Sequence, residues 1–429
     1  MLLQFSFKNY KSFRDDTTLD FAATKITEHT ERVINIGNEK ILPTAAIYGA
    51  NASGKSNVLE ALRYMHTYVI DSFSYGGEND DKKVKKDFPP TPFLFDCDSQ
   101  QTPSTFEVYY ITPEEEGAKT YQYGFSVGKA GIEEEWLNYR AKTSRGKFKT
   151  IFYRNTKEKE LDLTGLPKTA RENIAVALEA ETLIVSLGSK LKVKKLKRIR
   201  DWFYSNCFTD FGDPGENFFL SHLIPADFLD TQVQEKVVRF FASFDPSIVG
   251  FQVDEAADSE GKGRKRLKIN AVHKMVHSDQ TVSIPLQEES AGTLKMFALY
   301  PALRDVLDNG GVLFVDELNG RLHPLLVRNV LITFLNPEIN TQHAQIVFTT
   351  HDPWTLNNGL LRRDEIWFTE KNEDGISSLY SLADFVEGNK KIRKDENYEK
   401  NYLLGKYGAI PNLKSFGIAE DIGKYGKKG

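Results

Sequence analysis

The chain has 429 residues, a length that allows two or three domains with well-buried cores. Its 56 Lys and Arg against 60 Asp and Glu give a formal charge of −4, so the overall composition is not that of a basic nucleic-acid-binding protein and any basic surface must be local. Cys97 and Cys207 form no CxxC pair, which argues against a disulfide framework or a zinc knuckle. The N-terminal stretch lacks the apolar core of a signal peptide, and no window approaches the roughly 18 apolar residues of a membrane helix. We therefore expect a cytoplasmic protein with no membrane partner.

The first predicted elements surround a glycine-rich turn. Residues 3–7 and 18–21 alternate apolar and polar side chains and predict an opening β-hairpin. Residues 44–48 form a short apolar strand that runs into the turn. From Lys55 onward apolar residues recur at helical spacing, so the turn should open a helix. The polar, Pro-containing residues 75–101 predict a surface loop.

The middle of the chain predicts an antiparallel sheet followed by helices. The strand-like runs are residues 105–111, 121–127, 135–139 and 150–153. Helical patterns cover residues 167–206 and 233–244. Three further strands are predicted at residues 248–253, 266–272 and 281–285.

The last third alternates strands with helices. We expect a helix at 291–307, a strand at 311–315, a helix at 324–335 and a strand at 345–350. This alternation is typical of a parallel α/β sheet. The strand before the glycine-rich turn should join the same sheet, with the middle of the chain inserted between them.

The turn GANASGKSN, residues 49–57, has the spacing of a phosphate-binding P-loop. Gly49 and Gly54 let backbone N–H groups close around phosphate oxygens, and the helix that follows directs its positive end at the same anion. Lys55 would reach the β- and γ-phosphates of ATP, and the Ser56 hydroxyl would bind Mg²⁺. An accidental match is expected only about 0.02 times in a random chain of this length. The candidate nucleotide-binding residues are Gly49, Asn51, Ser53, Gly54, Lys55, Ser56 and Asn57.

The run GVLFVDE, residues 311–317, is an apolar strand that ends in two carboxylates, which is the Walker B pattern. Asp316 would hold Mg²⁺ through water, and Glu317 would orient or deprotonate the attacking water. Taken alone, Asp-Glu after a strand is more typical of a solvated turn. Combined with the P-loop, it favours a catalytic site with Lys55 and Glu317 among its residues.

His351 follows the next predicted strand in the motif TTHDP. A single histidine is more often structural or exposed. At a strand end, however, it should lie beside the P-loop and the Walker B carboxylates, where ligands gather on open α/β sheets. Its imidazole would then donate a hydrogen bond to the γ-phosphate, so we include His351 among the catalytic candidates.

Ser290 and Gly292, in the motif ESAGT, open the predicted helix of the last third. A helix N-terminus of this composition binds anions. The alternative is that Ser290 merely caps the helix and that Gly292 is incidental. The two residues are nucleotide-binding candidates because they occur between the P-loop and the Walker B strand.

The order of these motifs resembles that of ABC-type ATPase heads of the SMC/RecF/OLD group. Within that group, the chain resembles the RloA/AbiL-like ATPases of bacterial phage-defence and restriction-associated operons. The resemblance extends from residue 2 to about residue 385 and rests on the stretches FKNYKSF, YGANASGKSNVLEAL, TPFLFD, ESAGTLKMFAL, LFVDELNGRLHPLL and VFTTHDPWTL.

The resemblance implies an α/β ABC-ATPase head, with a P-loop parallel core sheet, an antiparallel β-subdomain and an inserted, largely helical subdomain. The expected division is 1–74 (N-terminal half of the head with the P-loop), 75–165 (loop and antiparallel β region), 166–247 (helical insertion), 248–385 (C-terminal half of the head) and 386–429 (tail). The tail is too short for the nuclease domain fused in OLD proteins.

The resemblance also implies that two heads sandwich two ATP molecules. Ser290 and Gly292 of one subunit would contact the γ-phosphate bound at Lys55 of the other, and Asn319 would lie at the dimer seam, where the family often has Asp. Arg14 is a candidate phosphate contact. ATP hydrolysis would thus change the contact between two copies, and the chain would be the sensor or motor of an anti-phage system with a separately encoded effector such as a nuclease.

Two alternatives remain open from the sequence. One is a RecF/SMC-like DNA-repair ATPase that binds DNA directly; the other is a scaffold with a vestigial nucleotide site, against which Lys55, Asp316 and Glu317 argue. The basic runs 190–200 and 262–266 are candidate DNA- or RNA-binding surfaces or, equally, solvated faces.

Overall fold

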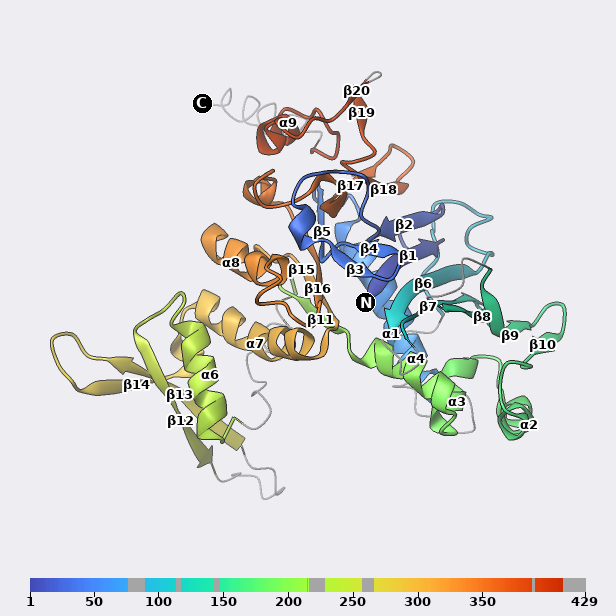
Figure 1. Cartoon of the computed structure of the whole chain (residues 1–429), viewed down its shortest axis with the longest axis horizontal. Helices are drawn as coiled ribbons and strands as arrows, with labels where there is room; N and C mark the ends of the chain where they lie inside the picture. Colours follow the sequence, from blue (N-terminus) through green and yellow to red (C-terminus); the bar gives the residue numbers. More distant parts are fainter. Residues whose placement is uncertain are drawn as a thin grey trace, which may run out of the picture.

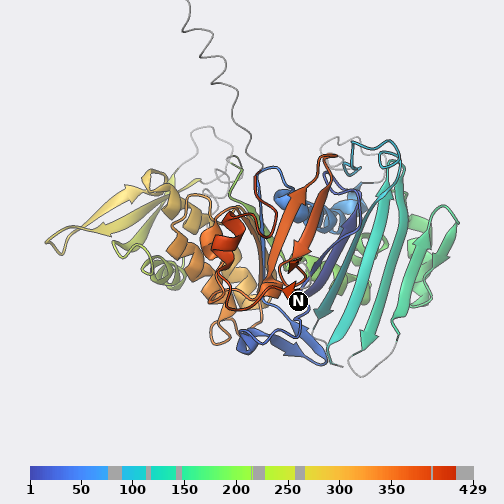
Figure 2. The ribbon, with the colours of Figure 1, turned by 90° about the horizontal axis from the view of Figure 1, so that it is seen from above.

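Two β-sheets form the body of the computed structural model, with helix α1 (Lys55–Asp71) between them (Figure 1). The structure describes residues 1–75, 89–112, 117–141, 147–213, 215, 228–256, 266–387 and 390–411. Figure 2 shows the antiparallel sheet on one side, the core sheet in the centre and a separate arm on the other side. The expected α/β fold class, with a parallel core sheet and an antiparallel subdomain, is confirmed.

The antiparallel sheet has seven strands in the order β10-β9-β8-β7-β6-β1-β2. The opening hairpin and the four strands expected between residues 105 and 153 are all present, and the hairpin pairs Phe5 with Leu19. The strands are β1 (Leu2–Lys8), β2 (Thr17–Asp20), β6 (Ser104–Thr112), β7 (Lys119–Gly128), β8 (Gly131–Ala141), β9 (Lys149–Asn155) and β10 (Glu160–Asp162). One face of this sheet is apolar, because alternate residues of β6 are buried.

The core sheet has six strands in the order β11-β15-β16-β5-β17-β18. The first five run parallel, and β18 is antiparallel to β17. Their bounds are β5 (Thr44–Gly49), β11 (Cys207–Asp210), β15 (Val312–Asp316), β16 (Gln345–Thr350), β17 (Ile366–Lys371) and β18 (Ser377–Ser381). The sequence predicted β5, β15 and β16. It did not predict β11, which has only four residues, or the β17–β18 hairpin.

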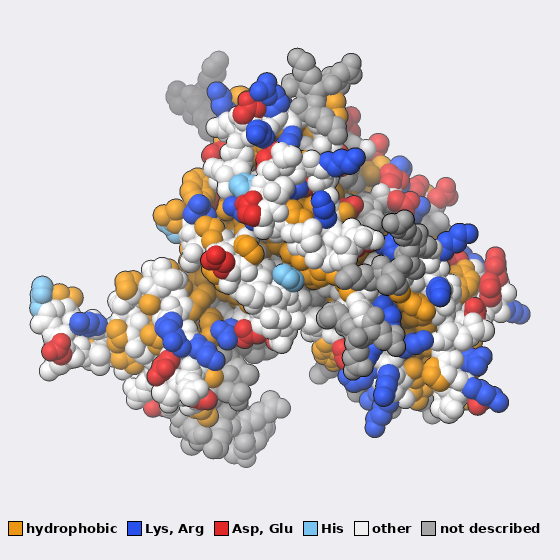
Figure 3. All heavy atoms as spheres, in the orientation of Figure 1, with side chains coloured by type: hydrophobic (Ala, Val, Ile, Leu, Met, Phe, Trp, Pro, Cys, Tyr) orange, Lys and Arg blue, Asp and Glu red, His pale blue; other side chains and the backbone are white. Residues whose placement is uncertain are grey.

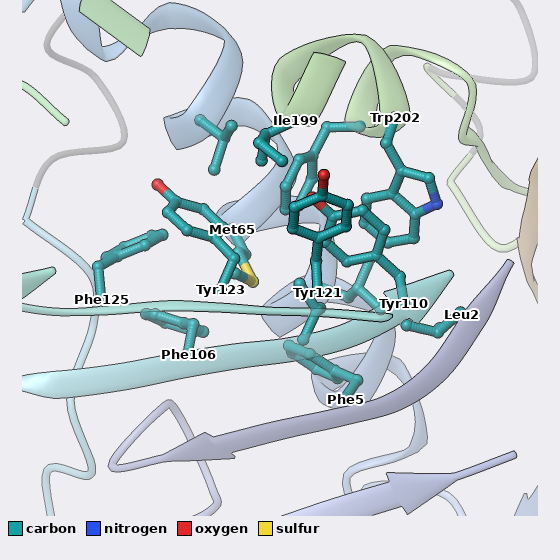
Figure 4. Close-up of a cluster of buried hydrophobic side chains, with 14 of the residues drawn as sticks. Leu2, Phe5, Met65, Phe106, Tyr110, Tyr121, Tyr123, Phe125, Ile199 and Trp202 are labelled. Atoms are coloured by element: carbon teal, nitrogen blue, oxygen red, sulfur yellow. The ribbon is translucent and has the colours of Figure 1, made fainter. Parts of the chain in front are cut away.

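Three helices of the inserted chain pack on the antiparallel sheet: α2 (Lys168–Ala177), α3 (Ile184–Lys190) and α4 (Lys194–Tyr204). Figure 4 shows Met65 of α1 and Ile199 and Trp202 of α4 meeting the aromatic face of the sheet. Trp202 stacks on Tyr110 with ring centroids 4.1 Å apart. Because large aromatic side chains bury about 150–250 Å² each, this contact is a main source of stability for the lobe.

The arm consists of helix α6 (Thr231–Phe241) and a three-stranded sheet of β12 (Ile248–Ala256), β13 (Arg266–Lys274) and β14 (Thr281–Pro285). It projects from the body in Figure 2. Phe241 and Phe251 of the arm pack on Phe297 of helix α7 (Ala291–Asn309), with ring centroids 6.1 and 5.7 Å away. The arm is thereby anchored to the helix that opens at Ser290.

The remaining elements complete the head. They are α8 (Pro324–Leu335), α9 (Tyr398–Leu403), the β3 (Ile34–Ile36) and β4 (Glu39–Ile41) pair, the β19 (Val386–Glu387) and β20 (Lys390–Lys391) pair, and 3-10 turns at Thr30–Arg32, Ser72–Ser74, Leu286–Glu288, Pro353–Thr355 and Arg363–Glu365. Residues 89–101 form the expected loop. Residues 76–88, and 262–265 of the second basic run, lie outside the described residues. Among the described helices none is long and apolar enough to cross a membrane.

The side chain of Gln345, at the start of β16, joins the two sheets. Its Oε1 accepts a hydrogen bond from Leu2 N at 2.6 Å, and its Nε2 donates to Leu2 O and Leu42 O, both at 3.0 Å. Gln345 is fully buried, so water cannot replace these bonds. The antiparallel sheet is thus tied through β1 to a central strand of the parallel sheet.

Replacing Gln345 with Leu should therefore lower the free energy of unfolding by about 2–4 kcal/mol, because it leaves three buried backbone groups without partners. Urea unfolding measures the change. The matched control is Gln342→Leu, at an exposed position three residues earlier, which should change stability by less than about 0.5 kcal/mol. Equal, small effects of both substitutions would contradict a structural tie at Gln345.

Candidate functional site

The P-loop connects the fully buried strand β5 to α1, as the sequence predicted. Gly54 adopts a left-handed φ of 109°, and a Cβ there would lie 2.7 Å from Ser377 Oγ. Lys55 is buried, and its Nζ donates to Gly49 O at 2.9 Å and Ala50 O at 3.0 Å. Burial lowers the pKa of Lys55, while the nearby Asp316 and Glu317 carboxylates raise it. The ammonium group is thus held at the turn, within electrostatic reach of Asp316 and Glu317.

Short hydroxyl side chains support the P-loop from two other parts of the chain. Ser53 Oγ lies 2.6 Å from Thr369 Oγ1 of β17. Ser377 Oγ of β18 donates to Ser53 O at 2.8 Å and lies 2.8 Å from Ser12 Oγ, whose hydroxyl can donate to it. Asn57 Nδ2 also donates to Ser12 Oγ, at 2.7 Å. Ser12, Thr369 and Ser377 were not among the predicted site residues, because Ser and Thr in a hairpin turn or a strand give no local sign of this role.

Of the other P-loop candidates, Asn51 is exposed at the tip of the turn and Ser56 is half-buried at the start of α1. Arg14, the weaker phosphate candidate, is exposed and donates from Nε to Asp15 Oδ1 at 3.0 Å. All predicted P-loop residues therefore occupy the same turn or the first helical residues. Arg14, in contrast, forms an ion pair with the adjacent Asp15.

The two Walker B carboxylates occupy the end of β15 and the turn beyond it. Thr349 Oγ1 of β16 donates to Asp316 Oδ1 and accepts from Glu317 N at 2.9 Å. Glu317 has a left-handed φ of 50°, so the chain turns sharply at this residue. One threonine side chain thereby fixes the position of Asp316 and the direction of the turn that bears Glu317.

Ser56 and Asp316 line one cavity of about 440 Å³. A hydroxyl and a carboxylate are oxygen ligands of the kind Mg²⁺ prefers, and Mg²⁺ commonly takes one or two protein ligands with phosphate oxygens and water. Among the described residues no group of three or more His, Cys, Asp or Glu could hold a metal by protein ligands alone. The donor set therefore fits a magnesium ion shared with a phosphorylated ligand.

His351 and Asn319 approach the same turn from two sides. Asn319 Oδ1 accepts from Thr350 Oγ1 at 2.7 Å, and its Nδ2 lies 3.3 Å from His351 Nε2. His351 itself is exposed. The structure thus brings the strand-end histidine to the turn after Glu317, through an asparagine that the sequence placed only at a dimer seam.

Asp210 is a further carboxylate that the sequence analysis missed. It ends β11 and lies opposite Asp316 in the parallel register, and it lines the same cavity. Burial, and then repulsion from Asp316, raises its pKa, while hydrogen bonds from the backbone N–H groups of Gly212 and Asp213 oppose the rise. Because β11 was not predicted, nothing in the sequence placed Asp210 beside Asp316.

Ser290 and Gly292 do not line the cavity of Ser56 and Asp316. Ser290 Oγ accepts from Thr293 N at 3.1 Å, so the capping role considered as the alternative is present. Both residues line a second cavity of about 920 Å³, with Arg321 and Arg328 among its other residues. The two cavities share no lining residue. In the described residues, Ser56 of the P-loop and the Asp316 carboxylate line one cavity, and the capped N-terminus of α7 lines the other with Arg321 and Arg328.

A family model described as "AAA domain, putative AbiEii toxin, Type IV TA system" matches residues 45–357. Comparison with curated protein sequences gives no match. Among solved structures, the chain is similar to the SMC head domain from Thermotoga maritima, with 15% identity and a TM-score of 0.39 over 90% of this chain and 99% of that one.

Two other solved structures are similar to the chain at comparable levels. An Smc head domain with coiled coil and joint from Pyrococcus yayanosii has 11% identity and a TM-score of 0.36, over 89% of this chain and 97% of that one. The recombination mediator RecF bound to ATP has 13% identity and a TM-score of 0.36, over 88% of this chain and 97% of that one. With TM-scores this low, the chemistry of the site rests on this chain's own residues.

Gly54→Ala should lower the free energy of unfolding by about 1–3 kcal/mol, because alanine is strained at this φ and its Cβ would overlap Ser377 Oγ. Urea unfolding of the ligand-free protein measures the effect. The control is Gly292→Ala, where an added Cβ would meet nothing closer than 3.6 Å and helix propensity favours alanine by up to about 1 kcal/mol. A loss for Gly292→Ala as large as that for Gly54→Ala would contradict this account.

Proposed function

The chain belongs to the family described as "AAA domain, putative AbiEii toxin, Type IV TA system". From that premise we propose that it binds ATP with Mg²⁺ and hydrolyses it as an ABC-type ATPase. The observation that supports this most is the convergence of three motifs at one edge of the core sheet. Lys55 is fixed at the P-loop within electrostatic reach of Asp316 and Glu317, and Ser56 shares a cavity with Asp316. These groups match what phosphoryl transfer requires, which is positioning and charge stabilisation.

Each group has a role in the proposed hydrolysis. The backbone N–H groups from Gly49 to Gly54 and the Lys55 ammonium bind phosphate oxygens, and Ser56 and Asp316 hold Mg²⁺. Glu317 orients or deprotonates the attacking water. The ion, when bound, neutralises charge on the transferred phosphoryl group. Asn319 holds His351 where its imidazole donates to the γ-phosphate.

We further propose that two copies assemble around two ATP molecules. The separation of the two cavities supports this, because Ser290 and Gly292 of one chain lie apart from the P-loop of the same chain and are available to the P-loop of another. A two-fold dimer places both contacts symmetrically. ATP then stabilises the closed dimer by its differential affinity for that state, and hydrolysis releases it.

The biological role we propose is that of sensor or motor in an anti-phage or restriction-associated complex with a separately encoded effector, as in RloA/AbiL-like systems. The family description, which names a toxin of a toxin–antitoxin system, supports a function in a multi-component system. The arm of α6 and β12–β14 is anchored to α7 through Phe241 and Phe251, so it could transmit closure of the heads to such a partner.

Glu317→Gln should bind ATP with nearly unchanged affinity but hydrolyse it at least about 100-fold more slowly, since the carboxylate that acts on water is lost. It should therefore accumulate as an ATP-dependent dimer. Lys55→Ala should neither bind ATP tightly nor dimerise. Phosphate release measures hydrolysis, and light scattering with and without Mg·ATP measures the dimer.

A mixture of Lys55→Ala and Gly292→Ala chains distinguishes a shared site from two independent ones. Each variant alone should be inactive, but their mixed dimer contains one intact site, so activity should return in an equal mixture, up to about a quarter of wild type. No return of activity, with both variants folded, would contradict the sandwich. ATP hydrolysis by a strict monomer would do the same.

Direct DNA binding, as in the RecF/SMC-like alternative, is favoured by one observation. Helix α4 buries Leu196, Ile199 and Trp202. Its basic residues Lys194, Lys195, Lys197 and Arg198 are exposed, whereas Arg200 is half-buried and donates to Ile70 O. In Figure 3 Lys and Arg side chains gather over the α2–α4 lobe at the lower right. Part of this charge is engaged, because Lys197 pairs with Asp201 at 2.6 Å and Lys195 donates to Gly165 O.

If α4 binds DNA, the triple variant Lys194→Glu, Lys195→Glu and Lys197→Glu should weaken ATP-dependent binding strongly. The slope of log K against log [salt] should become shallower by up to about 3. Fluorescence anisotropy at several salt concentrations measures both. Reversal of three exposed lysines on the arm side, Lys236, Lys268 and Lys274, is the matched control. Absence of DNA binding by the wild type would exclude this second function.

A further inference from the structure

Helix α7 contains a buried lysine that the proposed mechanism does not use. Lys295 lies five residues after Ser290, one and a half turns into the helix, and is 8% exposed. A lysine is almost never buried without a partner, because removing an ammonium group from water is costly. Its partners therefore indicate what keeps it there.

The Lys295 ammonium group joins three elements of the head. Nζ donates to Phe211 O, just after β11, at 3.0 Å and lies 4.4 Å from the centre of the Phe211 ring. On its other side is the turn after β15, where a Cβ on Gly320 would lie 2.9 Å from Nζ. A side chain at position 320 would therefore require Nζ to move. The helix of Ser290, the end of β11 and the Walker B turn thus meet at one charged atom.

Both of these neighbours are hydrogen-bonded to the backbone of the two Walker B residues. Phe211 N donates to Asp316 O at 3.0 Å, and Gly320 N donates to Glu317 O at 2.7 Å. The Glu317 carboxylate rests against Gly212, where an added Cβ would lie 3.2 Å from Glu317 Cδ. Gly212, which contacts the Glu317 carboxylate, directly follows Phe211, whose carbonyl accepts the hydrogen bond from Lys295. Lys295 therefore holds the segment against which the Glu317 carboxylate rests.

We propose that Lys295 is a positioning residue, which couples the N-terminal end of α7, with Ser290 and Gly292, to the placement of Glu317 within the same chain. When a second copy's nucleotide engages Ser290 and Gly292, a shift of α7 moves the ammonium group, and with it the Phe211 carbonyl and the Gly320 turn. Hydrolysis at one site is thereby linked to occupancy of the other. This inference rests on the proposed ATPase function.

The charges around Lys295 add a pH dependence. Burial, and then Arg321, lowers its pKa from the ordinary 10.5 to about 8, while Glu317 and Asp210 raise it. The ammonium group is therefore present below about pH 8 and is lost as the pH rises through that value. The neutral amine keeps two N–H donors but loses the charge, so its hydrogen bond to Phe211 O and its cation–π contact with the Phe211 ring weaken. The placement of Glu317 should therefore weaken on the alkaline side.

Measurements of ATP hydrolysis test the coupling in three variants, Lys295→Met, Lys295→Arg and Gly320→Ala. Lys295→Met should lower kcat about tenfold or more and change KM less than about threefold, since positioning of Glu317 acts on the chemical step. Lys295→Arg should keep most of kcat at pH 7 and remove the decline in rate above pH 8. Gly320→Ala, whose Cβ displaces Nζ, should act like Lys295→Met, and the double variant should be no worse than either.

The matched control is Arg304→Met, which removes an exposed cation from the same helix and should leave kcat and its pH profile unchanged. A kcat for Lys295→Met within twofold of wild type would overturn the proposal. So would an alkaline decline in Lys295→Arg identical to that of the wild type.

Amide hydrogen exchange provides a readout that does not need ATPase activity. In Lys295→Met, peptides covering residues 207–213 and 316–322 should exchange at least about tenfold faster, whereas peptides of β6–β8 should not change. If the wild type hydrolyses no ATP, the proposed function fails, and unchanged exchange in these two segments would independently overturn the link through Lys295.

Discussion

The register of the parallel strands is the constraint on which the rest of the site depends. β16 lies between β15 and β5, and this pairing sets Thr350 opposite Tyr48 and Phe348 opposite Val315. The carboxyl ends of the five strands β11, β15, β16, β5 and β17 therefore reach one edge, where the P-loop, the carboxylates and the histidine begin. A slip of one residue in any pair would turn the strand-end side chains to the opposite face.

Short hydroxyl side chains convert this register into a fixed geometry. Thr349 bonds both Asp316 and the backbone of Glu317, Thr350 bonds Asn319, and Thr369 bonds Ser53. A buried hydroxyl without a partner is costly, so each of these groups favours the single arrangement in which it is paired. A serine or threonine also has few rotamers, so little entropy is lost in holding the loop residues in place.

The contacts of α7 show how one helix can serve two sites. Its N-terminal cap lines a cavity separate from that of Ser56 and Asp316, while Lys295 further along reaches Phe211 and the Gly320 turn. The arm packs on the same helix through Phe297. A rigid helix with these three attachments connects the surface of the proposed second copy, the arm and the Walker B turn, and close packing transmits small shifts between them.

Local spacing and periodicity were enough to predict the strand–turn–helix of the P-loop, the apolar strand that ends in Asp316 and Glu317, the capped start of α7 and the α/β class. The residues that support these motifs became visible only in the folded chain. Ser12, Thr369 and Ser377 meet at the P-loop across more than 300 residues of chain, Asp210 faces Asp316 through a four-residue strand, and Lys295 meets Gly320. Long-range pairing of short polar side chains leaves no periodic pattern in a sequence, whereas the burial of alternating apolar residues does.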